Sequence, residues 1–329
     1  MASYNTISGL KVKYLSADPA NPEDGQVWYN SATGNLRVDG MVLAGSWASG
    51  GNMNQNRSFM GDAGTQTAAL GFGGMINPAT TNASESYDGS TWTTTPTINT
   101  TRTQISGAGT QTAALAFAGT PPGSTATESW NGSSWTAVNS MNTARQGTSG
   151  SGTQPAALVF GGQLTAPPWA ALTASEEWDG TNWTSGNSLP VARNAAAGFG
   201  TQTASLAAAG ASPATVSSVD EYDGTNWTAA PSMINARRNR PGGSGTTTSG
   251  IVFGGVVDPG GTTSNETEQY NGTSWSSTAT LGTARYGPGS ASPATAALCF
   301  GGSTGPTTTV AATEEFTGAS TQIKNITTS

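Results

Sequence analysis

One spacing recurs six times along this chain and strongly limits the folds that it can adopt. A tryptophan is followed ten residues later by an arginine, and successive tryptophans lie 43 to 48 residues apart. The tryptophans are Trp47, Trp92, Trp135, Trp183, Trp227 and Trp275, and the arginines are Arg57, Arg102, Arg145, Arg193, Arg237 and Arg285. A repeat of roughly 40 to 50 residues is typical of propeller blades and solenoid units. The chain is therefore expected to consist of six copies of one structural unit.

Each unit carries further marks in the same order. A small-residue apolar run such as Ala68 to Phe72 ends in a glycine pair or an Ala-Gly variant, whose second member lies 17 residues after the arginine, or 18 in the fifth unit. An acidic residue then precedes an aromatic residue by two positions; these acids are Glu85, Glu128, Glu176, Asp220, Glu268 and Glu314. In the first five units Asp-Gly or Asn-Gly follows, which is the sequence of a tight β-hairpin turn. Each unit is therefore expected to form four strands.

This pattern resembles the kelch repeat of galactose-oxidase-like β-propellers, over about Met41 to Ser329. The resemblance implies an all-β, six-bladed kelch-like β-propeller. The chain departs from the kelch pattern at Ala118 and Ala209, which replace the first glycine of the pair, and in its small strand residues.

The two ends of the repeat suggest how the propeller closes. In the sixth unit Thr321 stands where a tryptophan is expected, whereas Trp47 and Arg57 have no glycine pair before them. We therefore expect an N-terminal strand through Trp47 to complete the last blade, which would remove exposed sheet edges. Residues 321–329 are expected to pack outside as a tail.

The first residues lie outside the repeat and suggest an attachment arm. Residues 25–30 and 35–38, joined by Ser-Ala-Thr-Gly, are expected to form a short β-hairpin, after a Pro-containing linker at 18–22. The domain prediction is an arm over residues 1–42 and a propeller over 43–329. The stretch 22–30, with 36–38, resembles an element near the ends of bacteriophage tail-fibre and other virion proteins. This resemblance implies a virion protein, assembled in the host cytoplasm, whose residues 1–42 contact other virion proteins.

Composition removes several classes of function. The chain contains no histidine and a single cysteine, Cys299, so the usual metal ligands and the commonest general base are missing. No cofactor, no metal and no enzymatic activity are expected. Cys299 occupies the place of Val159 and Val252 in sister units and is expected to be buried. The formal net charge is -7, basic residues form no run, and no apolar stretch approaches a membrane span, so neither nucleic acid nor membrane insertion is expected.

The six arginines and six acids raise one catalytic alternative. Sialidases are also six-bladed propellers that use arginines, a tyrosine and acidic residues, but a catalytic site needs residues that differ between blades. We expect Arg-to-Glu pairs between blades. The alternative is a ring of these arginines that holds an anion at the channel mouth. Adjacent acids such as Glu176 and Glu177 should point to opposite faces of a strand, which argues against glycoside hydrolysis.

Residues that break the repeat are the candidates for ligand binding. Trp169 follows Pro167 and Pro168 in the longest variable loop, and Arg238 and Arg240 join Arg237 in the one local basic cluster. The leading hypothesis is a bacteriophage structural protein, in a tail fibre, tail or capsid surface, for adhesion to host-surface glycans or for protein assembly. A non-phage kelch adaptor or lectin-like propeller is the alternative, followed by a sialidase-like hydrolase. A homo-oligomer is compatible with all three.

Overall fold

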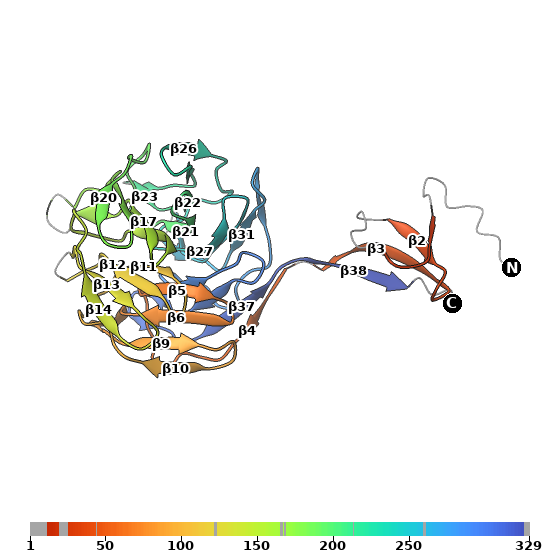
Figure 1. Cartoon of the computed structure of the whole chain (residues 1–329), viewed down its shortest axis with the longest axis horizontal. Helices are drawn as coiled ribbons and strands as arrows, with labels where there is room; N and C mark the ends of the chain where they lie inside the picture. The colour runs from red at the N-terminus through yellow and green to blue at the C-terminus, as the bar shows by residue number, and fades with distance from the viewer. Residues whose placement is uncertain are drawn as a thin grey trace. The chain divides into compact units, whose positions relative to one another are not determined.

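The chain is built entirely from β-structure in the part that the structure describes. The computed structural model describes residues 12–19, 26–43, 45–121, 124–164, 167, 169–212, 214–258 and 261–325, which contain strands and no helix (Figure 1). Nothing within these ranges is therefore a helix that could cross a membrane. The chain forms two compact units, one of residues 1–45 with 318–329 and one of Ser46–Thr317. The expected all-β class is confirmed.

The larger unit contains six four-stranded antiparallel sheets, numbered here in chain order. Sheet 1 is β5 (Gly61–Thr65), β6 (Ala68–Phe72), β9 (Ser84–Tyr87) and β10 (Trp92–Thr95), and sheet 2 is β11 (Ser106–Gly109), β12 (Ala114–Phe117), β13 (Thr127–Trp130) and β14 (Trp135–Val138). Sheet 3 is β16 (Ser149–Thr153), β17 (Ala156–Phe160), β19 (Ser175–Trp178) and β20 (Trp183–Ser185), and sheet 4 is β21 (Ala197–Thr201), β22 (Ala204–Ala208), β25 (Val219–Tyr222) and β26 (Trp227–Ala230). Sheet 5 is β27 (Gly242–Thr246), β28 (Ser249–Phe253), β31 (Thr267–Tyr270) and β32 (Trp275–Ser277). The four strands expected for each unit are therefore present.

Sheet 6 combines strands from the two ends of the larger unit. Its strands are β33 (Gly289–Ala291), β34 (Leu298–Phe300), β37 (Thr313–Thr317) and β4 (Ser46–Ser49). Strand β4 pairs antiparallel with β37, and Trp47 stands opposite Phe316, as Trp92 stands opposite Tyr87 in sheet 1. The first strand of each sheet lies beside the first strand of the next sheet, and β33 lies beside β5.

Short two-stranded ribbons involve the loops between the second and third strands. They are β7 (Met75–Ile76) with β8 (Ala79–Thr80), β15 (Arg145–Gln146) with β18 (Gln163–Leu164), β23 (Ala211–Ser212) with β24 (Ala214–Thr215), β29 (Val256–Val257) with β30 (Thr262–Thr263), and β35 (Ser303–Gly305) with β36 (Thr308–Thr309). In sheet 3 the partner, β15, comes from the connection before the first strand. β-Bridges such as Asn194 with Ala211 and Tyr286 with Ser303 tie these loops to the residue after a repeated arginine. The loops therefore gather around the start of each first strand.

Aromatic side chains fill the spaces between neighbouring sheets. Trp135 of sheet 2 packs on Phe72 of sheet 1 with ring centroids 4.9 Å apart, and Trp92 of sheet 1 packs on Phe300 of sheet 6 at 4.8 Å. Such pairs contribute about 1 kcal/mol beyond the area that they bury. Cys299 lies in β34 without exposed surface, as expected, and burial raises the pKa of its thiol to about 12.

The smaller unit is a separate four-stranded sheet with its own buried centre. It pairs β2 (Val27–Asn30) with β3 (Asn35–Leu43) as the expected hairpin, adds β1 (Lys13–Leu15) parallel to β2, and adds β38 (Ser320–Asn325) antiparallel to β3. Trp28 is fully buried and donates to the Asp18 carboxylate at 3.0 Å, which also accepts from Asn30 and pairs with Arg37. These bonds, the one from Asn30 above all, lower the pKa of Asp18.

The domain boundary differs from the expected one at 42/43. Residues 321–329 were expected as a tail of the propeller, but residues 321–325 lie in β38 and belong to the smaller unit, because their backbone groups find partners along β3. Residues 20–25, which carry most of the proline linker and the start of the phage-like stretch, lie outside the described residues, as do residues 326–329.

Candidate functional site

The six repeated arginines are buried, and each forms an ion pair through a terminal guanidinium nitrogen. The pairs are Arg57 with Glu85, Arg102 with Glu128, Arg145 with Glu176, Arg193 with Asp220, Arg237 with Glu268, and Arg285 with Glu314. Arg102 is representative, because its guanidinium donates to Glu128 at 2.9 Å and to the carbonyls of Ala118 and Ala126 at 2.7 and 2.8 Å. Burial lowers the pKa of Arg102, and the charge of Glu128 opposes this shift.

The sequence predicted that these pairs would join one blade to the next. In the structure each pair instead lies within one unit. Each arginine lies in the connection before a sheet, and its acid lies in the third strand of that same sheet. The second oxygen of Glu128 accepts the backbone N–H of Asn99 at 2.6 Å, and the corresponding oxygen of Glu176 accepts that of Asn142 at 2.7 Å. The pair therefore clamps the incoming connection onto the sheet.

Sheet 4 has a modified version of this clamp. Asp220 replaces glutamate, and Pro190, which has no backbone N–H, stands where Asn142 stands in the preceding unit. The shorter carboxylate still pairs with Arg193. Burial raises the pKa of Asp220, and the charge of Arg193 opposes this shift. The two departures match each other. Pro190 removes the backbone N–H donor, and Asp220 is shorter than the glutamate that accepts from this donor in the preceding unit.

The structure separates the four ligand-binding candidates. Arg237 has no exposed surface and belongs with the structural arginines, so it is removed from the ligand candidates. Arg238 is partly exposed and forms an ion pair with Asp258 at 3.2 Å. Trp169 is 57% exposed and has a left-handed φ of 50°, whereas its neighbour Pro168 lies outside the described residues. Arg240 lies elsewhere, inside the larger unit.

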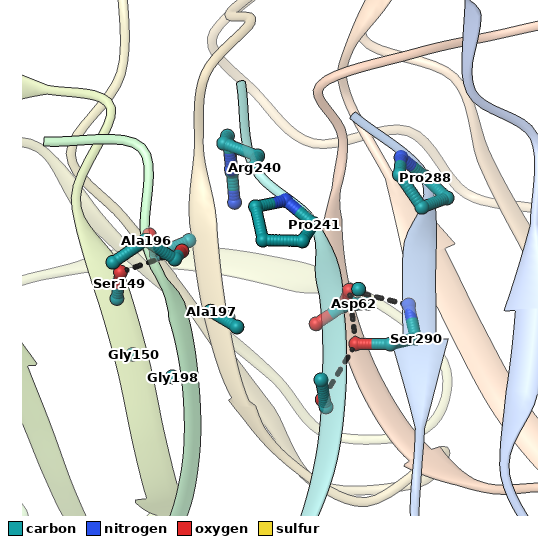
Figure 2. A pocket seen from close by; sticks show the side chains of 14 residues that line it. Asp62, Ser149, Gly150, Ala196, Ala197, Gly198, Arg240, Pro241, Pro288 and Ser290 are labelled. Carbon is teal, nitrogen blue, oxygen red and sulfur yellow. Dashed lines mark hydrogen bonds between the residues drawn. The ribbon is translucent and has the colours of Figure 1, made fainter. Parts of the chain in front are cut away.

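Arg240 lines a narrow central channel between the first strands of the six sheets (Figure 2). A hollow of about 40 Å³ is lined by Arg240, Asp62, Ser106, Ser149 and Ser290, among others. A second hollow of about 80 Å³ continues along the same strands and shares Asp62 and Ser290 with the first. A buried water needs roughly 10 to 15 Å³ of such space, so the first hollow holds a few waters or one small ion.

Asp62 breaks the symmetry of this channel. The equivalent residues of the other sheets are Gly107, Gly150, Gly198, Gly243 and Ser290. Glycine is needed where first strands approach closely, because a Cβ on Gly107 would lie 2.2 Å from the carbonyl oxygen of Asp62. The Asp62 carboxylate accepts the backbone N–H of Ser290 at 2.7 Å (Figure 2). Burial raises the pKa of Asp62 to about 6, against the opposing bond from Ser290 and the charge of Arg240.

Arg240 enters the channel through an insertion of one residue. In the other units one left-handed residue follows the repeated arginine by two positions, but the fifth unit has two, Asn239 and Arg240, with φ of 62° and 54°. The Arg240 N–H donates to Ala195 at 2.9 Å, and Gly287 donates to the Arg240 carbonyl at 3.1 Å, within a series of backbone bonds that runs around the channel mouth. The insertion is the physical basis of the 18-residue spacing in this unit.

The Arg240 guanidinium has no partner of opposite charge within hydrogen-bond reach. No ion pair joins it to Asp62 or to any other described acid, and its Nη1 is buried without a hydrogen-bond partner there. Burial lowers its pKa, which the charge of Asp62 opposes. Within the described ranges, no group of three or more Cys, Asp or Glu residues could hold a metal ion.

Arg240 was among the residues predicted from the sequence, whereas Asp62 was not. The signal was present, because Asp62 lies five residues after Arg57, and four other units have glycine five residues after their arginines. The repeat spacing does not show that this residue lies on the channel wall. The site thus combines one carboxyl group and one unpaired guanidinium in a polar channel that admits only small species.

These features define an all-β protein of propeller-like architecture, with four-stranded sheets packed around a channel. Among solved structures, the chain is similar to the one titled "Structure of YjhT", with a TM-score of 0.67 and 14% sequence identity over 83% of this chain and 99% of that chain. At this identity the likeness concerns the fold alone. No family model matches the chain, and no curated protein matches it.

Proposed function

We propose that the chain is a non-enzymatic structural protein of a bacteriophage virion, in which a closed, six-bladed, kelch-type propeller is displayed by an N-terminal attachment arm. The propeller serves adhesion to host-surface glycans or assembly with other virion proteins. The six sheets are its blades, and β4 closes the ring by completing the sixth.

Two contacts support the closed ring. Strand β33 of the last sheet lies beside β5 of the first, and Trp47 in β4 packs edge-on against Phe253 of sheet 5 with ring centroids 4.9 Å apart. With β4 in place, the sixth sheet has four strands like the other five.

The observation that carries the virion proposal is the separate sheet of the smaller unit. This sheet contains the described part of the stretch that resembles bacteriophage virion proteins, Gln26–Asn30 with Leu36–Val38. It has its own network centred on Asp18 and Trp28, and it contains strands from both regions that flank the propeller. A unit with its own buried centre is suited to serve as an attachment module, because it does not draw on the propeller for its packing.

The use of the repeated arginines supports a binding role over a sialidase-like one. A hydrolase of that kind needs arginines that reach a substrate, but all six repeated arginines have at most 1% exposed side-chain surface and contact acids of their own sheets. Their conserved spacing is accounted for by the clamp that they form.

The test separates the arm from the propeller. Asp18→Ala removes the acceptor shared by Trp28, Asn30 and Arg37 and leaves the propeller sheets untouched, so we expect a folded propeller that is lost from purified virions. Asp223→Asn is the matched control, because Asn131 and Asn271 occupy the same exposed turn in sister blades. Immunoblots of virions provide the measurement. Incorporation of Asp18→Ala at the normal copy number would reject the proposal.

A further inference from the structure

We propose that the central channel binds a small monovalent anion, of the size of chloride or a carboxylate group, at Arg240. The site lies in the hollow between Arg240 and Asp62, at the mouth ringed by left-handed residues. This binding site is independent of the proposed attachment role.

The first argument is that the Arg240 guanidinium lacks an ion-pair partner among the described residues. A buried charge without a partner is unfavourable, and buried arginines are normally paired, as the six repeated ones are. Arg240 is partly buried as a whole, its Nη1 is fully buried without a hydrogen-bond partner, and it forms no ion pair among the described residues. An anion in the hollow would accept from this nitrogen and offset the charge.

The second argument is the polarity and size of the hollow. First strands that face the channel present backbone N–H and C=O groups along their open edges. The Ser106 hydroxyl is already hydrogen-bonded to Thr148 and the Ser149 hydroxyl already donates to the Ala196 carbonyl, at 2.8 to 2.9 Å, so Arg240 is the principal free donor. About 40 Å³ excludes a sugar and favours a monatomic or small planar anion.

The third argument concerns the charge of Asp62, which controls the site. Of the residues that line the two hollows, only Asp62 and Arg240 titrate; the others, from β11, β16, β21, β27, β33 and their connections, are Gly, Ala, Ser, Pro and Phe. The pKa of Asp62 is raised to about 6. Below that pH the channel carries the charge of Arg240 alone, whereas above it the carboxylate repels an entering anion. Anion binding should therefore strengthen as the pH falls through 6.

The experiment uses chloride as the probe with the full chain. Bound chloride broadens the ³⁵Cl resonance of free chloride, and we expect excess broadening at pH 5 that is about tenfold weaker at pH 8. Arg240→Gln should lose this broadening at both pH values. The matched control is Arg238→Gln, because Arg238 is two residues away, partly exposed and paired with Asp258; it should behave as the unaltered chain.

A second variant protects the test against misfolding of the first. Asp62→Asn removes the competing carboxylate, so broadening at pH 8 should rise to the level seen at pH 5, a gain that an unfolded protein would not show. Retained broadening in Arg240→Gln, or no gain in Asp62→Asn, would overturn the proposal.

Competition identifies the source of the anion. Formate should displace chloride if the site accepts a carboxylate. A triglycine peptide with a free C-terminus, compared with its amide, tests whether the carboxylate can be carried by a polypeptide. Displacement by the free peptide assigns a partner's carboxylate, and displacement by formate alone assigns a free ion.

Discussion

Arg237 and Arg240 lie three residues apart in the same connection, yet they have opposite environments. Arg237 pairs with Glu268 at 2.6 Å and donates to the carbonyls of Gly254 and Glu266, both at 3.1 Å. Arg240 forms no ion pair with any described acid, and its Nη1 is buried without a hydrogen-bond partner. The first residue recurs in every unit, and the second is present through an insertion in one unit.

This difference shows how to interpret a symmetric protein. A residue repeated in each blade meets the same partners six times, so its role belongs to the blade. A residue that departs from the repeat has no such explanation, and here two departures, Asp62 and Arg240, lie in the same hollow.

The largest effect on the unfolding free energy is expected when each of these two arginines is substituted in turn. Arg237→Met leaves Glu268 buried without its partner, and removing one member of a buried pair typically costs about 3 to 5 kcal/mol of unfolding free energy. Arg240→Gln removes a charge that has no partner, and we expect a change of less than about 1 kcal/mol. Urea unfolding of both variants measures the difference. Equal destabilisation by the two substitutions would show that Arg237 and Arg240 do not differ in their contribution to stability.

A smaller effect is expected from the pH dependence of Asp62. Its pKa is about 6 in the folded chain and about 3.9 in an unfolded one, so between these values the folded state binds a proton that the unfolded state does not. The unfolding free energy therefore falls by about 2 kcal/mol as the pH rises from 4 to 6.

Asp62→Asn cannot titrate and should lose this contribution. The measurement is the unfolding free energy of the variant minus that of the unaltered chain at several pH values, which cancels the other carboxylates. It should rise by about 2 kcal/mol between pH 4 and pH 6. A difference independent of pH would mean that Asp62 titrates normally.

The repeat made much of the fold predictable, for identifiable physical reasons. Hairpin turns and apolar runs are local signals, so the strands of sheet 1 follow from residues within a few positions of one another. The place of Trp47 in the last sheet was predictable because Thr321 stands where the sixth unit is expected to have its tryptophan. The position of Arg240 in the channel did not follow, because an extra residue predicts a longer connection but not the direction of its side chain.

Sheet 4 offers a test within the repeated set. The double variant Asp220→Glu with Pro190→Asn rebuilds the bond that Glu176 makes with Asn142, and we expect a gain of about 1 kcal/mol. Neither single change should suffice, because each restores only the acceptor or only the donor. A double-mutant cycle by urea unfolding measures the coupling, and simple additivity would show that the two departures are unrelated.

The smallest effect on stability is expected at Trp169, the exposed residue that departs from the repeat. Trp169→Ala should change the unfolding free energy by less than about 0.5 kcal/mol, because the side chain is largely in solvent. If this loop contacts a host glycan, binding on a glycan array is lost while stability is kept. A large loss of stability would instead place Trp169 among the packing residues.

The C-terminal strand marks another limit of sequence-based prediction. Residues 320–325 carry no strong strand pattern, and their partner β3 lies some 280 positions earlier, Leu43 opposite Ser320. Pairing at such separation depends on where the rest of the chain brings its two ends, which no local pattern contains.

The pairing of Ser46 with Thr317 has a wider consequence. The first and last residues of the larger unit are opposite each other, as are Leu43 and Ser320 in the smaller one. In topological terms the propeller is an insertion of 272 residues into the loop of a β-hairpin. A domain whose two ends lie side by side can be inserted into a loop of another protein, because the hairpin that receives it keeps its own geometry.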